Sequence, residues 1–152
     1  MSGVADFSWA FSTRRDATGG SQVANGNPKA ATFVGTAMSK WTTTSATSLY
    51  GTFFAAGEMN SDLSKWSVAK VGTLANTFNS ASKFAGTGLE SWDTASVTTM
   101  KSMFYSANKF TGVGVVELWN TASVTTLEST FQGASEMTAD LSGWKVSKVV
   151  TL

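Results

Sequence analysis

The stretch WDTASVTTMKSMFYSANKF, from Trp92 to Phe110, is repeated along this chain of 152 residues. Counted from Trp92, apolar residues stand at offsets +5, +8, +12, +15 and +18, which are Val97, Met100, Phe104, Ala107 and Phe110. The same offsets counted from Trp41, Trp66 and Trp119 also reach apolar residues, and Trp144 begins a shorter copy. Successive tryptophans are 25, 26, 27 and 25 residues apart. A period of this length with matching apolar offsets identifies a repeat protein.

Each repeat is expected to contain one short helix and one short extended segment. Offsets +8, +12 and +15 follow the spacing i, i+4, i+7, which places three apolar side chains on one helix face. Hydroxyl residues precede this stretch, and the run from Thr125 to Glu128 fits a capping box at a helix start. One repeat cannot bury its aromatic residues alone, whereas stacked neighbours share a continuous core. The predicted fold class is therefore an α/β repeat solenoid of about four and a half coils.

The chain divides into an N-terminal cap and a regular array. Residues 1–29 are predicted to form a cap and loop, because residues 17–29 are rich in glycine, asparagine and serine and contain the only proline. Residues 30–40 are interpreted as a degenerate first repeat. The regular repeats are predicted at 41–65, 66–91, 92–118 and 119–143, followed by a partial repeat at 144–152. Because a partial coil leaves apolar side chains and backbone groups open, we expect a protein partner to cover it.

Composition argues against several functional classes. The chain has no histidine and no cysteine, so it lacks the commonest general base, the commonest metal ligand and a thiol nucleophile. A net charge of +1 leaves no basic stripe for nucleic acid. No apolar run reaches the roughly 18 residues of a membrane span, and no signal peptide, lipidation cysteine or anchor is visible. We therefore expect a protein that is not an enzyme and has no cofactor or metal, with peripheral association to a membrane complex left open.

Two aromatic columns are assigned to the structural core. An aromatic residue that recurs at one repeat position is more often buried than exposed to a ligand, although a row of tryptophans could also stack against sugar rings. The tryptophan column is Trp41, Trp66, Trp92, Trp119 and Trp144, and the phenylalanine column at offset +12 is Phe53, Phe78, Phe104 and Phe131.

Polar residues supply further candidate sites. Three carboxylate pairs, among them Glu58 with Asp62, have the residue types used in glycoside hydrolysis, but their variable positions favour a solvated surface. A threonine row at offset +7 could bind an ordered lattice such as ice, while helix capping is the preferred interpretation. Partner contacts are predicted at non-core residues that follow a tryptophan: Ser67, Asp93, Asn120 and Lys145.

The repeat motif resembles the short repeats, about 25 residues long, of BspA-like surface proteins. It is carried by DLSKW at 62–66, SWDTASVTTMKSMFYSANKF at 91–110, LWNTASVTTLESTFQGASEM at 118–137 and DLSGW at 140–144. The resemblance implies a leucine-rich-repeat-like solenoid with a non-catalytic interaction surface. It also implies a secreted or cell-surface location, as for bacterial surface lipoproteins and adhesins, and it transfers no active-site residue.

Two functions follow from these observations. The first is a structural, protein-interaction module that serves as a peripheral scaffold or linker subunit of a larger assembly. The alternative is a cell-surface adhesin that binds host protein or glycan. Because no targeting segment or anchor is visible in the sequence, the periphery of an organelle or membrane complex is the alternative location.

Overall fold

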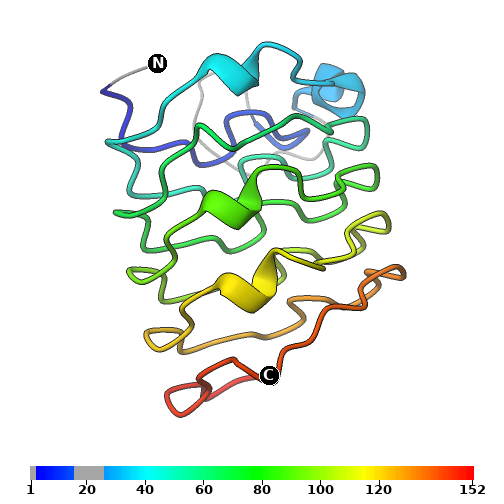
Figure 1. Ribbon diagram of the computed structural model, residues 1–152. Helices are drawn as coiled ribbons and strands as arrows, with labels where there is room; N and C mark the ends of the chain where they lie inside the picture. The colour runs from blue at the N-terminus through cyan, green and yellow to red at the C-terminus, as the bar shows by residue number, and fades with distance from the viewer. Residues whose placement is uncertain (1–2, 16–25) are drawn as a thin grey trace.

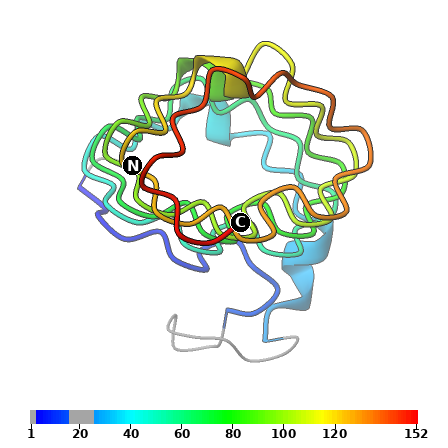
Figure 2. The same cartoon turned by 90° about the horizontal axis from the view of Figure 1, so that it is seen from below.

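The computed structural model describes residues 3–15 and 26–152. The chain winds in successive turns that lie one above the next, from the N-terminal end in blue to the C-terminal end in red (Figure 1). Viewed along the stack, the turns follow nearly the same outline (Figure 2). We call each turn a rung and number the rungs by repeat: rung 1 (41–65), rung 2 (66–91), rung 3 (92–118), rung 4 (119–143) and rung 5 (144–152).

In the described part of the chain, helical structure is limited to short 3-10 segments. These are η1 Pro28–Thr32, η2 Met38–Lys40, η3 Leu89–Ser91 and η4 Val116–Leu118. The longest has five residues, and within residues 3–15 and 26–152 there is neither an α-helix nor a β-strand. Moreover, η2, η3 and η4 come directly before a tryptophan, where an extended segment was expected. The prediction of an α/β, leucine-rich-repeat-like solenoid with one helix and one extended segment per coil is therefore wrong.

The stretch predicted to be helical is instead a run of turns that bonds to the next rung. In rung 2, alternate backbone amides from Leu74 to Ser80 donate to carbonyl oxygens of rung 3 at 2.7–3.0 Å. Of the intervening amides, those of Thr77 and Asn79 donate to carbonyls three residues back in their own rung, and that of Ala75 donates to the Thr73 hydroxyl. An α-helix commits its amides to carbonyls four residues back and so offers none to a neighbour. The same alternation recurs between rungs 1 and 2 and between rungs 3 and 4.

Left-handed backbone at two positions per rung explains why no helix forms. Residues at offsets +10 and +14 have positive φ: Gly51, Ala55, Asn76, Ser80, Ser102, Ser106, Ser129 and Gly133. Glycine adopts this conformation freely and asparagine tolerates it, whereas a right-handed helix needs negative φ throughout. The hydroxyls at offset +7 therefore cap turns, and Thr73 Oγ1 accepts from the backbone amide of Ala75 at 3.2 Å. The helix-capping interpretation of this row is wrong as well.

Single parallel bridges join each rung to the next at offset +7. They link Asp6 to Ser48, Ser48 to Thr73, Thr73 to Thr99, Thr99 to Thr126 and Thr126 to Thr151. The first bridge comes from the N-terminal segment 5–13, whose amides at Phe7, Trp9 and Phe11 donate to rung 1 carbonyls. This segment therefore adds a partial rung at the N-terminal end. The predicted loop at 17–29 falls mostly on residues 16–25, which lie outside the described residues.

The core is a stack of aromatic rings that runs through the rungs. Centroids of Phe53, Phe78, Phe104 and Phe131 are 5.5, 5.5 and 5.8 Å apart in succession. Packed helices lie about 8–10 Å apart, so this spacing leaves no room for one helix per rung. Beside it, Trp41 stacks on Trp66 at 6.4 Å and Trp92 stacks on Trp119 at 6.5 Å. Aromatic stacking and backbone hydrogen bonds therefore act together to hold the rungs in register.

Candidate functional site

The two aromatic columns face the interior over most of their length. Their buried members are Trp66, Trp92, Trp119, Phe53, Phe78 and Phe104, while Trp41, Trp144 and Phe131 are partly buried. The indole of Trp119 donates to the Leu89 carbonyl of rung 2 at 3.2 Å, and that of Trp144 donates to the Val116 carbonyl of rung 3 at 2.8 Å. In rungs 2 to 4 the tryptophans therefore present no open ring face on which a sugar could stack.

The four residues predicted to contact a partner lie one per rung along the tryptophan column. Asp93, Asn120 and Lys145 are exposed and Ser67 is partly buried. The side-chain oxygens of Asp93 and Asn120 each accept the backbone amide two residues ahead, at 3.1 Å. These two side chains thus stabilise local turns. Partner contact at this row stays a prediction.

The acidic residues serve structural contacts between and within rungs. Ion pairs between adjacent rungs join Lys83 to Glu58, Lys101 to Glu128 and Lys109 to Glu136. Asp62 and Asp140 each accept the backbone amide of a serine two residues ahead at 2.8 Å, and this bond lowers the pKa of both carboxyls. Across the described part of the chain, no three acidic side chains meet as a metal site.

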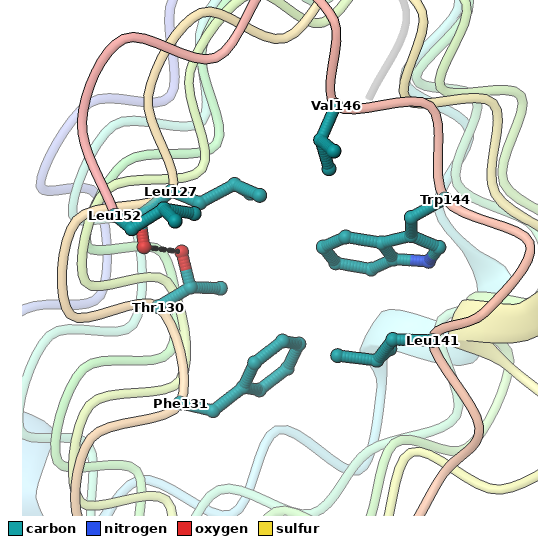
Figure 3. Close-up of a pocket in the computed structure, with 7 residues that line it drawn as sticks. All are labelled: Leu127, Thr130, Phe131, Leu141, Trp144, Val146 and Leu152. Carbon is teal, nitrogen blue, oxygen red and sulfur yellow. Dashed lines mark hydrogen bonds between the residues drawn. The ribbon is translucent and has the colours of Figure 1, made fainter.

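An apolar pocket of about 270 Å³ lies at the C-terminal end of the stack, among inward-pointing residues of rungs 4 and 5. Figure 3 shows its lining: Leu127, Thr130, Phe131, Leu141, Trp144, Val146 and Leu152. The side chains of Phe131, Leu141 and Trp144 point into the same space (Figure 3). Thr130 donates its hydroxyl to the Leu127 carbonyl at 2.6 Å, so its polar atom is already bonded. The pocket therefore offers hydrocarbon and ring surface to whatever enters it.

Neighbouring rungs show what fills the corresponding place elsewhere. Phe104 is 0% exposed because the ring of Phe131 stacks on it, whereas Phe131 itself is only partly buried. On rung 5, Val146 is 51% exposed, and Val150 and Leu152 are each 85% exposed. Rungs 4 and 5 thus contact the rest of the stack on their N-terminal side, and their C-terminal side is uncovered.

Backbone donors run along the same uncovered side. In rung 3, alternate amides donate to rung 4 carbonyls, and these donors are Ser102, Phe104 and Ser106. Their equivalents in rung 4 are Ser129, Phe131 and Gly133, for which residues 3–15 and 26–152 supply no acceptor. We name this surface the C-terminal edge and define it as the seven pocket residues together with Ser129 and Gly133.

The sequence analysis anticipated an open apolar edge at the partial repeat but missed its row of donors. Gly51 and Gly133 interrupt the predicted helix and are a sequence signal against it. Two glycines inside the predicted helix, one at offset +10 and one at offset +14, indicate a backbone that needs positive φ.

Comparison with known proteins identifies a family but no activity. A family model described as "Mycoplasma protein of unknown function, DUF285" matches residues 25–112 and 73–152. The overlapping matches fit a repeat-type family, which is related to BspA-like surface repeats. No curated protein and no solved structure matches the chain. Among the described residues, no helix has the length and apolar character needed to cross a membrane.

Proposed function

This chain belongs to the DUF285 family, whose description assigns no activity, and we propose that it is a non-catalytic protein-interaction module. In this proposal it is a peripheral scaffold or linker subunit of a larger assembly, and another polypeptide covers its C-terminal edge. The supporting observation is the apolar pocket of that edge, whose lining includes the exposed side chains of Val146 and Leu152.

The energetics of this edge favour association. Complete burial of a valine or leucine side chain contributes about 1.5–3 kcal/mol. Val146 and Leu152 of rung 5 are exposed and line the pocket together with the half-buried ring of Trp144. A cluster of this kind, around a concave aromatic pocket, has the features of an interaction site.

The test is to purify the tagged chain from its source together with its bound subunits. A variant with Val146→Asp and Leu152→Asp places two charges on the edge and is expected to lose any stoichiometric partner. Val113→Asp is the matched control, because Val113 is 59% exposed and does not line the pocket. Retention of the partner by the double variant would exclude the edge as its interface. Purification of the wild-type chain alone would contradict the scaffold function.

The same co-purification test examines a second candidate contact surface, the row of residues beside the tryptophans. A variant with alanine at Ser67, Asp93, Asn120 and Lys145 leaves the C-terminal edge unchanged. If only this variant releases the partner, the interaction surface is the side of the stack.

The alternative proposal is a cell-surface adhesin that binds host protein or glycan. It is supported by the relation of the family to BspA-like surface repeats. Fractionation of the source cells distinguishes the two functions, since an adhesin is expected in the surface or secreted fraction. We also keep the expectation that the protein is not an enzyme and carries no cofactor.

A further inference from the structure

The first tryptophan of the column, Trp41, has ring surface that the buried tryptophans of rungs 2 to 4 do not offer. Trp66 stacks on one side of Trp41, with centroids 6.4 Å apart and planes 5° from parallel. Trp41 is nevertheless only partly buried, and it lines two cavities of about 360 and 470 Å³ at the N-terminal end of the stack. Cavities of roughly 300–1,000 Å³ are typical of small-molecule sites.

The smaller cavity, which we call the Trp41 cavity, lies between the N-terminal segment and rung 1. It is lined by the rings of Phe7, Phe11 and Trp41 and by the polar side chains of Asp6 and Arg15, among others. Backbone hydrogen bonds fix the N-terminal wall, because the amides of Phe7 and Phe11 donate to rung 1 carbonyls at 3.0 and 2.8 Å. Both walls of the cavity therefore come from the described chain and are bonded to each other.

Two charged side chains of opposite sign reach this cavity. One carboxylate oxygen of Asp6 accepts the backbone amide of Ser8 at 2.8 Å, and the second oxygen is a further acceptor. The guanidinium of Arg15 donates from Nη1 to the Ala10 carbonyl at 3.2 Å, and its other N–H groups are further donors. The two bonds orient the charged groups, and each group keeps the capacity to bond a ligand.

An aromatic ring beside one acceptor and one donor restricts the class of ligand. An anionic aromatic molecule would face the carboxylate of Asp6, and a cationic one would face the guanidinium of Arg15. A neutral hydrocarbon ring would displace water from both groups without replacing its hydrogen bonds, which is costly. A pyranose ring fits all three, because its hydroxyls donate and accept while its C–H face packs on the negative face of an indole.

We propose that the Trp41 cavity binds a single pyranose ring, which stacks on Trp41 and places hydroxyl groups on the Asp6 carboxylate and the Arg15 guanidinium. The cavity and the C-terminal edge lie at opposite ends of the stack (Figure 1). The inference therefore goes beyond the scaffold function and does not rest on it. In the adhesin alternative, this cavity would be the contact for a glycan.

The test titrates the ¹⁵N-labelled chain with the methyl glycosides of glucose, galactose, mannose and N-acetylglucosamine. At least one glycoside is expected to shift the indole N–H signal of Trp41, with a Kd on the order of 1 mM. The Trp41 signal is identified as the one that disappears in Trp41→Phe. The indole of Trp119 is the internal control, because it is buried and bonded to the Leu89 carbonyl.

Arg15→Ala tests the donor side of the cavity. It is expected to weaken glycoside binding at least about fivefold, because hydrogen bonds from a charged group are lost. The matched control is Arg14→Ala, since the guanidinium of Arg14 lies 4.4 Å from the ring centroid of Phe54 and does not line the cavity. Binding by this control should be unchanged.

Asp6→Asn tests the acceptor side. The asparagine keeps an oxygen for the Ser8 amide, so the turn is retained, but it loses the charge and should bind at least about fivefold more weakly. Asp62→Asn is the matched control, because Asp62 accepts the Ser64 amide at the same 2.8 Å and lies outside the cavity.

Several outcomes overturn this inference. Absence of a shift at Trp41 with every glycoside at tens of millimolar contradicts it, as does unchanged binding in both the Arg15 and the Asp6 variants. A shift caused by benzoate or p-cresol but by no glycoside would assign the cavity to an aromatic ligand instead.

The bound pyranose can be a free sugar or the end of a glycan, and a trisaccharide that ends in the same sugar separates these sources. Binding as tight as that of the glycoside indicates a glycan end, and weaker binding indicates a free sugar. This experiment and the co-purification test fail independently. Absence of sugar binding leaves the scaffold function intact, and purification of the chain alone leaves the sugar site intact.

Discussion

The ring of Phe131 covers the ring of Phe104, with centroids 5.8 Å apart and planes 3° from parallel. Both residues belong to one column, but Phe104 is fully buried between two rungs while Phe131 lies at the C-terminal edge. The same substitution at the two positions therefore measures how much a covering rung contributes to the free energy of unfolding.

Phe104→Ala is expected to destabilise the chain by about 3–5 kcal/mol, because it leaves a cavity in the continuous stack. Phe131→Ala should cost at least about 1 kcal/mol less, since part of its ring is already in water. Equilibrium unfolding in urea measures both values. Equal losses would contradict the account of an uncovered edge.

Gly88 occupies a position that no other residue fits. Its φ is +91°, and a β-carbon placed on it would lie 2.2 Å from the backbone nitrogen of Ser64 in the preceding rung. Gly88→Ala is expected to destabilise by more than about 1 kcal/mol, because backbone atoms must move. Gly143→Ala is the control, with no atom within 4 Å of the added carbon, and should change stability by less than about 0.5 kcal/mol. Similar thermal unfolding of both variants would refute the close approach at Gly88.

Ser106 distinguishes the observed turn run from the helix that the sequence suggested. Its φ is +52°, and its amide donates to the Gln132 carbonyl at 2.8 Å. Glycine relieves left-handed strain, so Ser106→Gly should keep or raise the free energy of unfolding. In a helix interior the same change would cost up to about 1 kcal/mol.

Gln132→Gly is the comparison at an exposed position without positive φ, and it is expected to lose about 0.5–1 kcal/mol. Urea denaturation of the two variants gives the comparison. A loss at Ser106 as large as that at Gln132 would argue for helical backbone.

Acid should remove a small stabilising contribution at Asp62 and Asp140. The backbone amides of Ser64 and Ser142, and then the hydroxyls of the same serines, lower the pKa of these carboxyls below the ordinary value of 3.8. A lowered folded-state pKa means that the stabilisation is complete above the unfolded-state pKa and is lost as the pH falls through the folded-state value. The double variant with Asp62→Asn and Asp140→Asn should therefore show a shallower fall of Tm between about pH 5 and pH 2. If Tm falls equally with acid in the double variant and in the wild type, these hydrogen bonds do not stabilise the folded turns.

The repeat period and the buried ring columns could be predicted because they depend on spacing alone. Phe78 and Trp66 recur at fixed offsets, and any stacked arrangement buries such columns. The backbone between them could not be predicted from that spacing. Inward residues at +8, +12 and +15 fit a helix face, and they fit equally a turn run in which Leu74, Phe78 and Ala81 point inward.

Local residue preference decided between these two backbones. Gly51 and Asn76 at offset +10 favour positive φ. The hydrogen bonds from alternate amides to the next rung stabilise the resulting backbone. That pairing depends on the neighbouring rung, so the donors of the C-terminal edge at Phe131 and Gly133 became recognisable only with the fold. The predicted contact residues Asp93 and Asn120 are a second example. The structure gives their side chains turn-forming hydrogen bonds, which composition could not specify.

Hydrogen exchange of backbone amides in the free, monomeric chain tests the central claim most directly. The amides of Ser102, Phe104 and Ser106 donate to rung 4 and should exchange slowly. Those of Ser129, Phe131 and Gly133 occupy equivalent positions on the C-terminal edge and should exchange at least about tenfold faster, because no rung receives them. Equal protection of the two sets in a sample shown by sedimentation to be monomeric would mean that the edge is closed and is not a docking surface.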